Sequence, residues 1–101
     1  MPSASATAPV TWEPDKLLAL ALSQPSEALA AAREVLARHP PASQAAVAHQ
    51  AAGVVFRDFG DIGQAIEEFK NARRFARKAG DHDLESDVSA SLASALVLAG
   101  Q

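Results

Sequence analysis

The chain has 101 residues, of which 49% are hydrophobic, and its formal net charge is −3. This length and hydrophobic content favour a single folded domain, and the acidic balance makes nucleic acid an unlikely main partner. The absence of cysteine excludes a disulfide framework, a thiolate metal site and a cysteine nucleophile.

Alanine dominates the composition and indicates closely packed helices. The chain contains 24 alanines and no tyrosine. Alanine is the best helix former, and its small side chain lets neighbouring helices approach closely. Strand-forming residues never alternate over a strand-length run. We therefore expect an all-α fold.

The first part of the chain predicts a lead-in followed by two helices. Residues 1–12 are small, polar and contain proline, so we expect a disordered lead-in to a helical domain at 13–101. A short helix opens at Pro14, and a second one follows the interruption "SQPSEA" and continues to about His39, where two prolines end it. The apolar body of the short helix is formed by Leu17, Leu18, Leu20 and Leu22.

Three further helices are predicted in the rest of the chain. Ser43 can cap a third helix that reaches about Phe59, and Gly60 suits the left-handed residue that ends it. Asp61 then caps a fourth helix, with Gln64 as the second half of a capping box. After the break "AGDHD", a fifth helix has apolar residues at helical spacing. These are Leu84, Val88, Leu92, Leu96 and Val97.

The helical segments also resemble one another. With a shift of 37 residues, 27–40 lies over 64–77, and small and apolar residues coincide. With a shift of 40 residues, 51–60 lies over 91–100. Helical repeats with a period in this range indicate a solenoid of stacked helix pairs.

The best-defined repeat, at 46–79, resembles the tetratricopeptide repeat (TPR) family, whose pattern places small and aromatic residues at fixed offsets over two helices. The matching residues, with "FGD" as the turn between the helices, are Gly53, Phe56, Gly60, Asp61, Ala65, Phe69 and Ala72. The family's Trp and Pro positions hold His49 and Arg77. Partial repeats at 15–40 and 86–101 flank this unit. The resemblance implies an α-solenoid of antiparallel helix hairpins with about five helices.

The same resemblance implies a protein-interaction module rather than an enzyme. In TPR proteins the first helix of each pair lines a concave groove that holds a peptide or a partner helix. The residues that match this concave face are Val47, Gln50, Ala51, Val54, Arg57, Asp87, Ala90, Ser91 and Ser94. A well-known TPR clamp grips a peptide's terminal carboxylate with Lys and Asn, but Gln50 and Val54 occupy its positions here, so we expect that clamp to be absent.

Two alternatives concern the context in which the module works. The last helix lacks the second helix of its repeat, so we expect either a longer array after Gln101 or a homo-oligomer formed through the end helices. The repeats are also similar to arrays attached to bacterial signalling proteins, such as CHAT peptidases and ATPase-type transcription regulators. The chain could therefore be a regulatory or sensing segment of a larger protein, or a self-contained helical dimer.

The sequence offers no pattern for catalysis, a cofactor or a metal. The glycines around Asp61 lack the Lys-Ser or Lys-Thr pair of a phosphate-binding loop, and a helix rather than a strand precedes them. Glu67 and Glu68 are adjacent and diverge on a helix, so we expect both to be solvated. The acidic segment 81–87 lacks the spaced His or Cys pairs of a specific metal site.

Five of the nine basic residues form one stripe on the fourth helix. They are Lys70, Arg73, Arg74, Arg77 and Lys78. An anionic partner could bind this stripe. We favour the simpler interpretation of a solvated outer face beside the acidic segment 81–87.

The sequence also predicts a cytoplasmic location and no membrane partner. No apolar run approaches the ~20 residues of a membrane-spanning helix. The residues before "LLALAL" are acidic as well as basic, unlike the start of a secretory signal.

Overall fold

The computed structural model describes residues 14–100, which form five helices and no strand. The helices are α2 (Pro14–Ser23), α3 (Pro25–Ala37), α4 (Ala42–Asp58), α5 (Ile62–Ala79) and α6 (His82–Ala99). The predicted all-α fold with five helices is confirmed for this part of the chain. The predicted lead-in at 1–12 lies outside the described residues. No helix within 14–100 is both long enough and apolar enough to cross a membrane.

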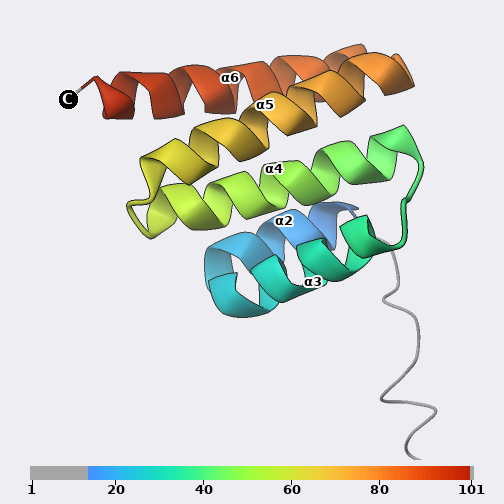
Figure 1. Cartoon of the computed structure of the whole chain (residues 1–101), viewed down its shortest axis with the longest axis horizontal. Coiled ribbons are helices and arrows are strands. Elements are labelled where there is room, and N and C mark those ends of the chain that lie inside the picture. Colours follow the sequence, from blue (N-terminus) through green and yellow to red (C-terminus); the bar gives the residue numbers. More distant parts are fainter. Residues whose placement is uncertain (1–13, 101) are drawn as a thin grey trace, which may run out of the picture.

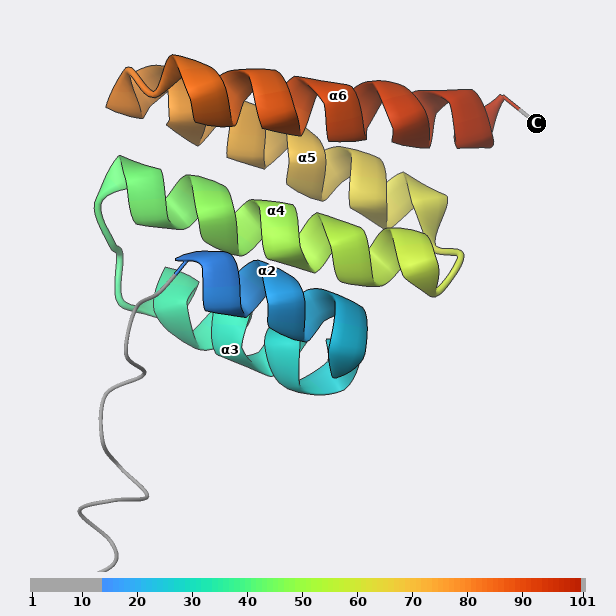
Figure 2. The same ribbon diagram turned by 180° about the vertical axis from the view of Figure 1, so that it is seen from behind.

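Each helix runs antiparallel to the one before it, and the helices stack in chain order from α2 and α3 at one end to α6 at the other (Figure 1). Helix α4 lies in the middle, where it contacts α5 on one side and both α2 and α3 on the other. Helix α6 packs mainly on α5. Seen from behind, α2 lies in front of α3, and α6 lies in front of α5 (Figure 2).

A close contact joins Gly53 of α4 to Phe69 of α5. A Cβ atom added to Gly53 would lie 2.5 Å from Cε1 of the Phe69 ring, so a side chain does not fit there. The ring of Phe69 is completely buried, as are Ala65 and Ala72 one turn away on either side of it. Small residues thus let the two backbones approach, and one aromatic ring fills the remaining space.

The two turns that flank α5 have the same construction. In each, a glycine has a left-handed backbone, with φ of 85° at Gly60 and 70° at Gly80. The aspartate that follows then caps the next helix: Oδ1 of Asp61 and of Asp81 accepts a hydrogen bond from the amide three residues later, at 3.3 and 3.0 Å respectively. The predicted capping box is only half formed, because the Asp61 amide already donates to a carbonyl of α4 at 2.9 Å.

Two predicted boundaries at the α3–α4 connection are wrong. Helix α3 ends at Ala37 rather than at His39, and His39 itself has a positive φ of 51°. Ser43 does not cap α4, because that helix begins at Ala42 and Pro41 occupies the N-cap position without a side-chain hydrogen bond. The extended backbone of Pro41 (φ −54°, ψ 154°) leads directly into the first helical turn.

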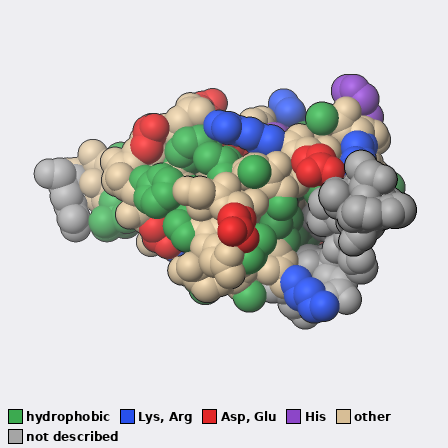
Figure 3. All heavy atoms as spheres, turned by 90° about the horizontal axis from the view of Figure 1, so that it is seen from below, with side chains coloured by type: hydrophobic (Ala, Val, Ile, Leu, Met, Phe, Trp, Pro, Cys, Tyr) green, Lys and Arg blue, Asp and Glu red, His purple; other side chains and the backbone are tan. Residues whose placement is uncertain are grey.

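Within residues 14–100, five large apolar residues are exposed, and three of them were expected in the apolar rows of their helices. The five are Leu22, Phe59, Leu96, Val97 and Leu98. Most lie in the last turns of helices, where the neighbouring helix no longer covers all of the apolar side chains. Figure 3, which views the stack from the α2–α3 end, shows hydrophobic side chains gathered among charged ones on that face as well.

Replacing Gly53 with alanine is expected to destabilise the fold by about 1–3 kcal/mol, because the added methyl group meets a buried ring that cannot move away. Gly63→Ala is the matched control. Nothing lies within 4 Å of a Cβ atom at Gly63, and removing a helical glycine should stabilise by about 0.5 kcal/mol. Urea unfolding of both variants measures the difference, and an unchanged midpoint for Gly53→Ala would contradict the close contact.

Candidate functional site

The part of the predicted concave face that lies on α4 is buried. The four residues concerned, each at most 9% exposed, are Val47, Gln50, Ala51 and Val54. Helices α2 and α3 pack on α4, and the three apolar members belong to a cluster shared with both helices. These side chains therefore do not form an open groove. Only Arg57 is partly exposed, with Nε 3.4 Å from Oδ1 of Asp58.

The part of the predicted concave face that lies on α6 is open. Ser91 is partly buried, and the exposed members are Asp87, Ala90 and Ser94. Two large apolar residues, Val97 (63% exposed) and Leu98 (42% exposed), continue the same side of the helix at helical spacing. We call this surface the α6 face, and it consists of Asp87, Ala90, Ser94, Val97 and Leu98.

The predicted basic stripe on α5 is divided among several local contacts. Nζ of Lys70 lies 3.7 Å from Oε2 of Glu67, and Arg77 forms an ion pair with Glu85 of α6. The guanidinium carbon of Arg74 lies 5.2 Å above the centre of the Phe75 ring, a distance suited to a cation–π contact. Arg73 is half-buried and Lys78 is exposed.

The acidic segment 81–87 has structural contacts of its own. Asp81 caps α6, and Glu85 holds Arg77 of α5, which is the contact between the basic stripe and this segment that the sequence suggested. Within residues 14–100 no three His, Cys, Asp or Glu side chains come close enough to hold a metal ion.

A polar contact that the sequence did not predict joins α4 to α5. Nδ1 of His49 lies 2.7 Å from Oε1 of Glu68, and the two side chains are only 16% and 20% exposed. The expectation that Glu68 is solvated is therefore wrong, whereas Glu67 is exposed as expected. The His49 ring also stacks on Phe75, with ring centres 5.5 Å apart and planes 8° apart.

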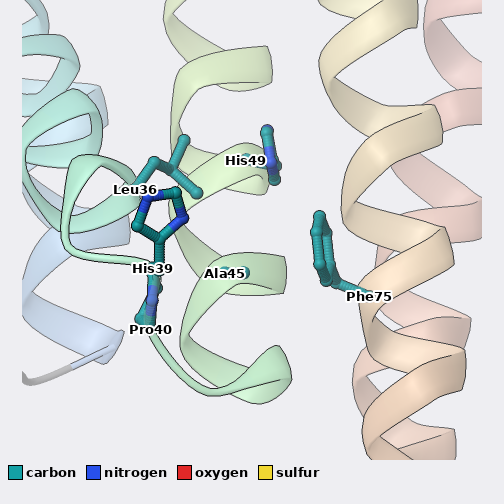
Figure 4. A pocket seen from close by; sticks show the side chains of 6 residues that line it. All are labelled: Leu36, His39, Pro40, Ala45, His49 and Phe75. Atoms are coloured by element: carbon teal, nitrogen blue, oxygen red, sulfur yellow. The ribbon is translucent and has the colours of Figure 1, made fainter.

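The His49–Phe75 pair forms part of an open pocket of about 330 Å³. Figure 4 shows its arrangement: side chains from the end of α3 and the following loop form one side, Phe75 of α5 forms the other, and α4 lies between them. The lining residues are Leu36, His39, Pro40, Ala45, His49 and Phe75.

The sequence held a partial signal for this pocket. In the resemblance to the TPR pattern, His49 matches the position of Trp, one turn before Gly53, and it contacts α5 through Glu68. Glu68 and Phe75 are seven residues apart and hence share one face of α5. The helical pattern did not indicate that the His39 loop would close the opposite side.

No family model, curated protein or solved structure matches the chain. Its function therefore has to be inferred from its own surfaces.

Replacing Glu68 with alanine is expected to destabilise the fold by about 1–2 kcal/mol, because a half-buried His49 nitrogen loses its charged partner. Glu67→Ala is the matched control: it makes the same change one residue away, and its exposed pair with Lys70 should contribute about 0.5 kcal/mol or less. Thermal unfolding of the two variants compares them. Equal melting temperatures would mean that the His49–Glu68 contact does not stabilise the fold.

Replacing Gln50 with methionine is expected to stabilise the chain by about 1 kcal/mol. The reason is that Oε1 of Gln50 is buried and has no hydrogen-bond partner among the described residues. Methionine has a similar shape without the unpaired oxygen. The urea unfolding midpoint measures the change, and a lower midpoint would show that the amide has a stabilising role.

Proposed function

We propose that the chain is a non-enzymatic protein-interaction module of the TPR type, which binds a helix of a partner protein on the α6 face. The antiparallel helix pairs and the contact of Gly53 with Phe69 support the TPR-type arrangement. The part of the predicted concave face that remains accessible, on α6, supports the location of the binding surface.

The observation on which the proposal mainly rests is the exposure of Val97 and Leu98 beside Ala90 and Ser94. Leaving a large aliphatic side chain in water forgoes about 1.5–3 kcal/mol relative to burying it. Contiguous exposed apolar side chains on an otherwise well-packed helix are typical of interaction sites. The small neighbours Ala90 and Ser94 would let a partner backbone approach α6 closely, as Gly53 lets α5 approach α4.

The charges of α6 favour a partner helix of defined polarity. The helix begins with Asp83 and Glu85 in its first turn and has no basic residue in its last turn. Within the chain, α5 runs antiparallel to α6 and places its basic end beside this acidic start, through Arg77 and Glu85. A partner helix that lies antiparallel to α6 repeats this complementarity if its N-terminal half is apolar and its C-terminal half carries Lys or Arg. The basic half then lies beside the acidic start of α6.

A second copy of the chain fits the α6 face less well. Antiparallel pairing of two α6 helices would set the apolar end of each against the acidic start of the other. Parallel pairing would bring the two acidic starts together. The α6 face is therefore better matched to a different protein than to itself.

Selection of displayed amphipathic helical peptides against the chain tests this proposal. We expect enrichment of peptides whose basic residues lie in the C-terminal half. Val97→Glu should weaken their binding about tenfold or more, since it places an unpaired charge in the apolar contact. Leu22→Glu, which changes another exposed leucine on α2 (70% exposed), is the control and should change binding less than about twofold.

Two results would contradict the proposal. One is selected peptides that bind Val97→Glu as tightly as the parent chain. The other is a dimer of the parent chain in sedimentation experiments that Val97→Glu dissociates, because the occupant of the α6 face would then be a second copy.

A further inference from the structure

The pocket between α3, α4 and α5 is lined by apolar and aromatic side chains together with two histidines, His39 and His49. Its volume of about 330 Å³ lies near the lower end of the roughly 300–1,000 Å³ typical of ligand sites. A single ring system fits this space better than an extended ligand. The pocket does not include any residue of the α6 face.

One side of the pocket is an aromatic wall that is held in place before any ligand arrives. Phe75 is stacked on His49 and covered by the guanidinium of Arg74. His49 is in turn anchored to Glu68 by the hydrogen bond at its Nδ1 atom. Rings fixed in this way lose little conformational freedom on binding, which favours contact with a further planar group.

The acceptor that the proposal uses is Nε2 of a neutral His49 ring. An ionised carboxylate can only accept hydrogen bonds, so Nδ1 of His49 donates to Glu68. In the neutral ring, Nε2 is then the acceptor. Nε2 lies on the ring edge away from Glu68 and has no hydrogen-bond partner among the described residues. A ligand with an N–H or O–H group on its ring would satisfy it.

The opposite wall includes a histidine with an unusual backbone. His39 has φ of 51°, a left-handed conformation that is uncommon for residues other than glycine and that follows the end of α3. Figure 4 shows its imidazole ring beside Leu36, facing Phe75 across the pocket. A planar ligand entering the pocket would therefore lie between the His39 ring and the aromatic wall.

We propose that this pocket binds the indole ring of a tryptophan side chain from a partner polypeptide, with the indole N–H donating to Nε2 of His49. Indole is planar and apolar, and its nitrogen only donates a hydrogen bond, which matches the unpaired acceptor at Nε2 of His49. Tryptophan is also among the residues that contribute most to protein–protein binding when they insert into a preformed pocket. This site is separate from the α6 face and does not depend on it.

The test uses N-acetyltryptophanamide as the probe and NMR signals of the His49 and Phe75 rings as the readout. The chain contains one tryptophan, Trp12, so the titration is done on Trp12→Phe to remove any competition from it. We expect saturable shifts at both rings. The N1-methylated analogue, which has no N–H, should bind about fivefold more weakly.

Two variants separate recognition from folding. His49→Phe keeps an aromatic ring but removes the acceptor, so it should bind both probes equally. His39→Gly relieves the left-handed backbone, so it should fold at least as stably as the parent while binding the probe about fivefold or more weakly, because one wall is lost.

Three results would overturn the proposal. The first is the absence of saturable shifts at His49 and Phe75. The second is a preference for the unmethylated probe that persists in His49→Phe. The third is a change in the His49 and Phe75 signals caused by Trp12→Phe alone, because the pocket would then be occupied by the chain's own indole.

Discussion

The fold depends on how closely α4 and α5 approach each other at Gly53. With no side chain at this position, the Phe69 ring lies directly against the α4 backbone and is completely sealed from water. Helices α2 and α3 then pack on the far side of α4, and α6 packs on the far side of α5. A wider spacing between α4 and α5 would leave a cavity around the ring, and the many alanines of the core are too small to fill it.

The same spacing sets the geometry of the pocket. His49 lies one turn before Gly53, and Glu68 is the neighbour of Phe69. The 2.7 Å contact between His49 and Glu68 therefore exists because Gly53 and Phe69 hold the helices at this distance. The proposed tryptophan site therefore lies beside the α4–α5 contact, whereas the α6 face lies on a helix that packs mainly on α5.

The sequence predicted the elements of the fold well because their signals are local. Gly60 favours a left-handed backbone, and Asp61 and Asp81 favour helix caps, so each residue indicates a turn by itself. Gly53 and Phe69 fit one repeat pattern. Burial of the predicted concave residues on α4 was not predictable in the same way. Whether Val47 or Val54 faces solvent depends on where α2 lies. The sequence of neither helix alone predicts how α2 packs on α4. The pocket was missed for a related reason, since it requires His39 in a loop to face Phe75 on a helix 36 residues later.

The stacking order also bears on how the chain folds. Apart from α2, which packs on α4 as much as on α3, each helix has its main contacts with helices next to it in the sequence, and the turns around α5 close with their own hydrogen bonds. Contacts between sequence neighbours cost little loop-closure entropy, which places such proteins among the fast folders. We therefore expect the α4–α5 hairpin to form early and α6, which packs mainly on α5, to open readily. Amide hydrogen exchange would show this as protection that falls from α4 towards the end of α6. If so, the proposed partner helix binds the least protected part of the chain and slows its opening.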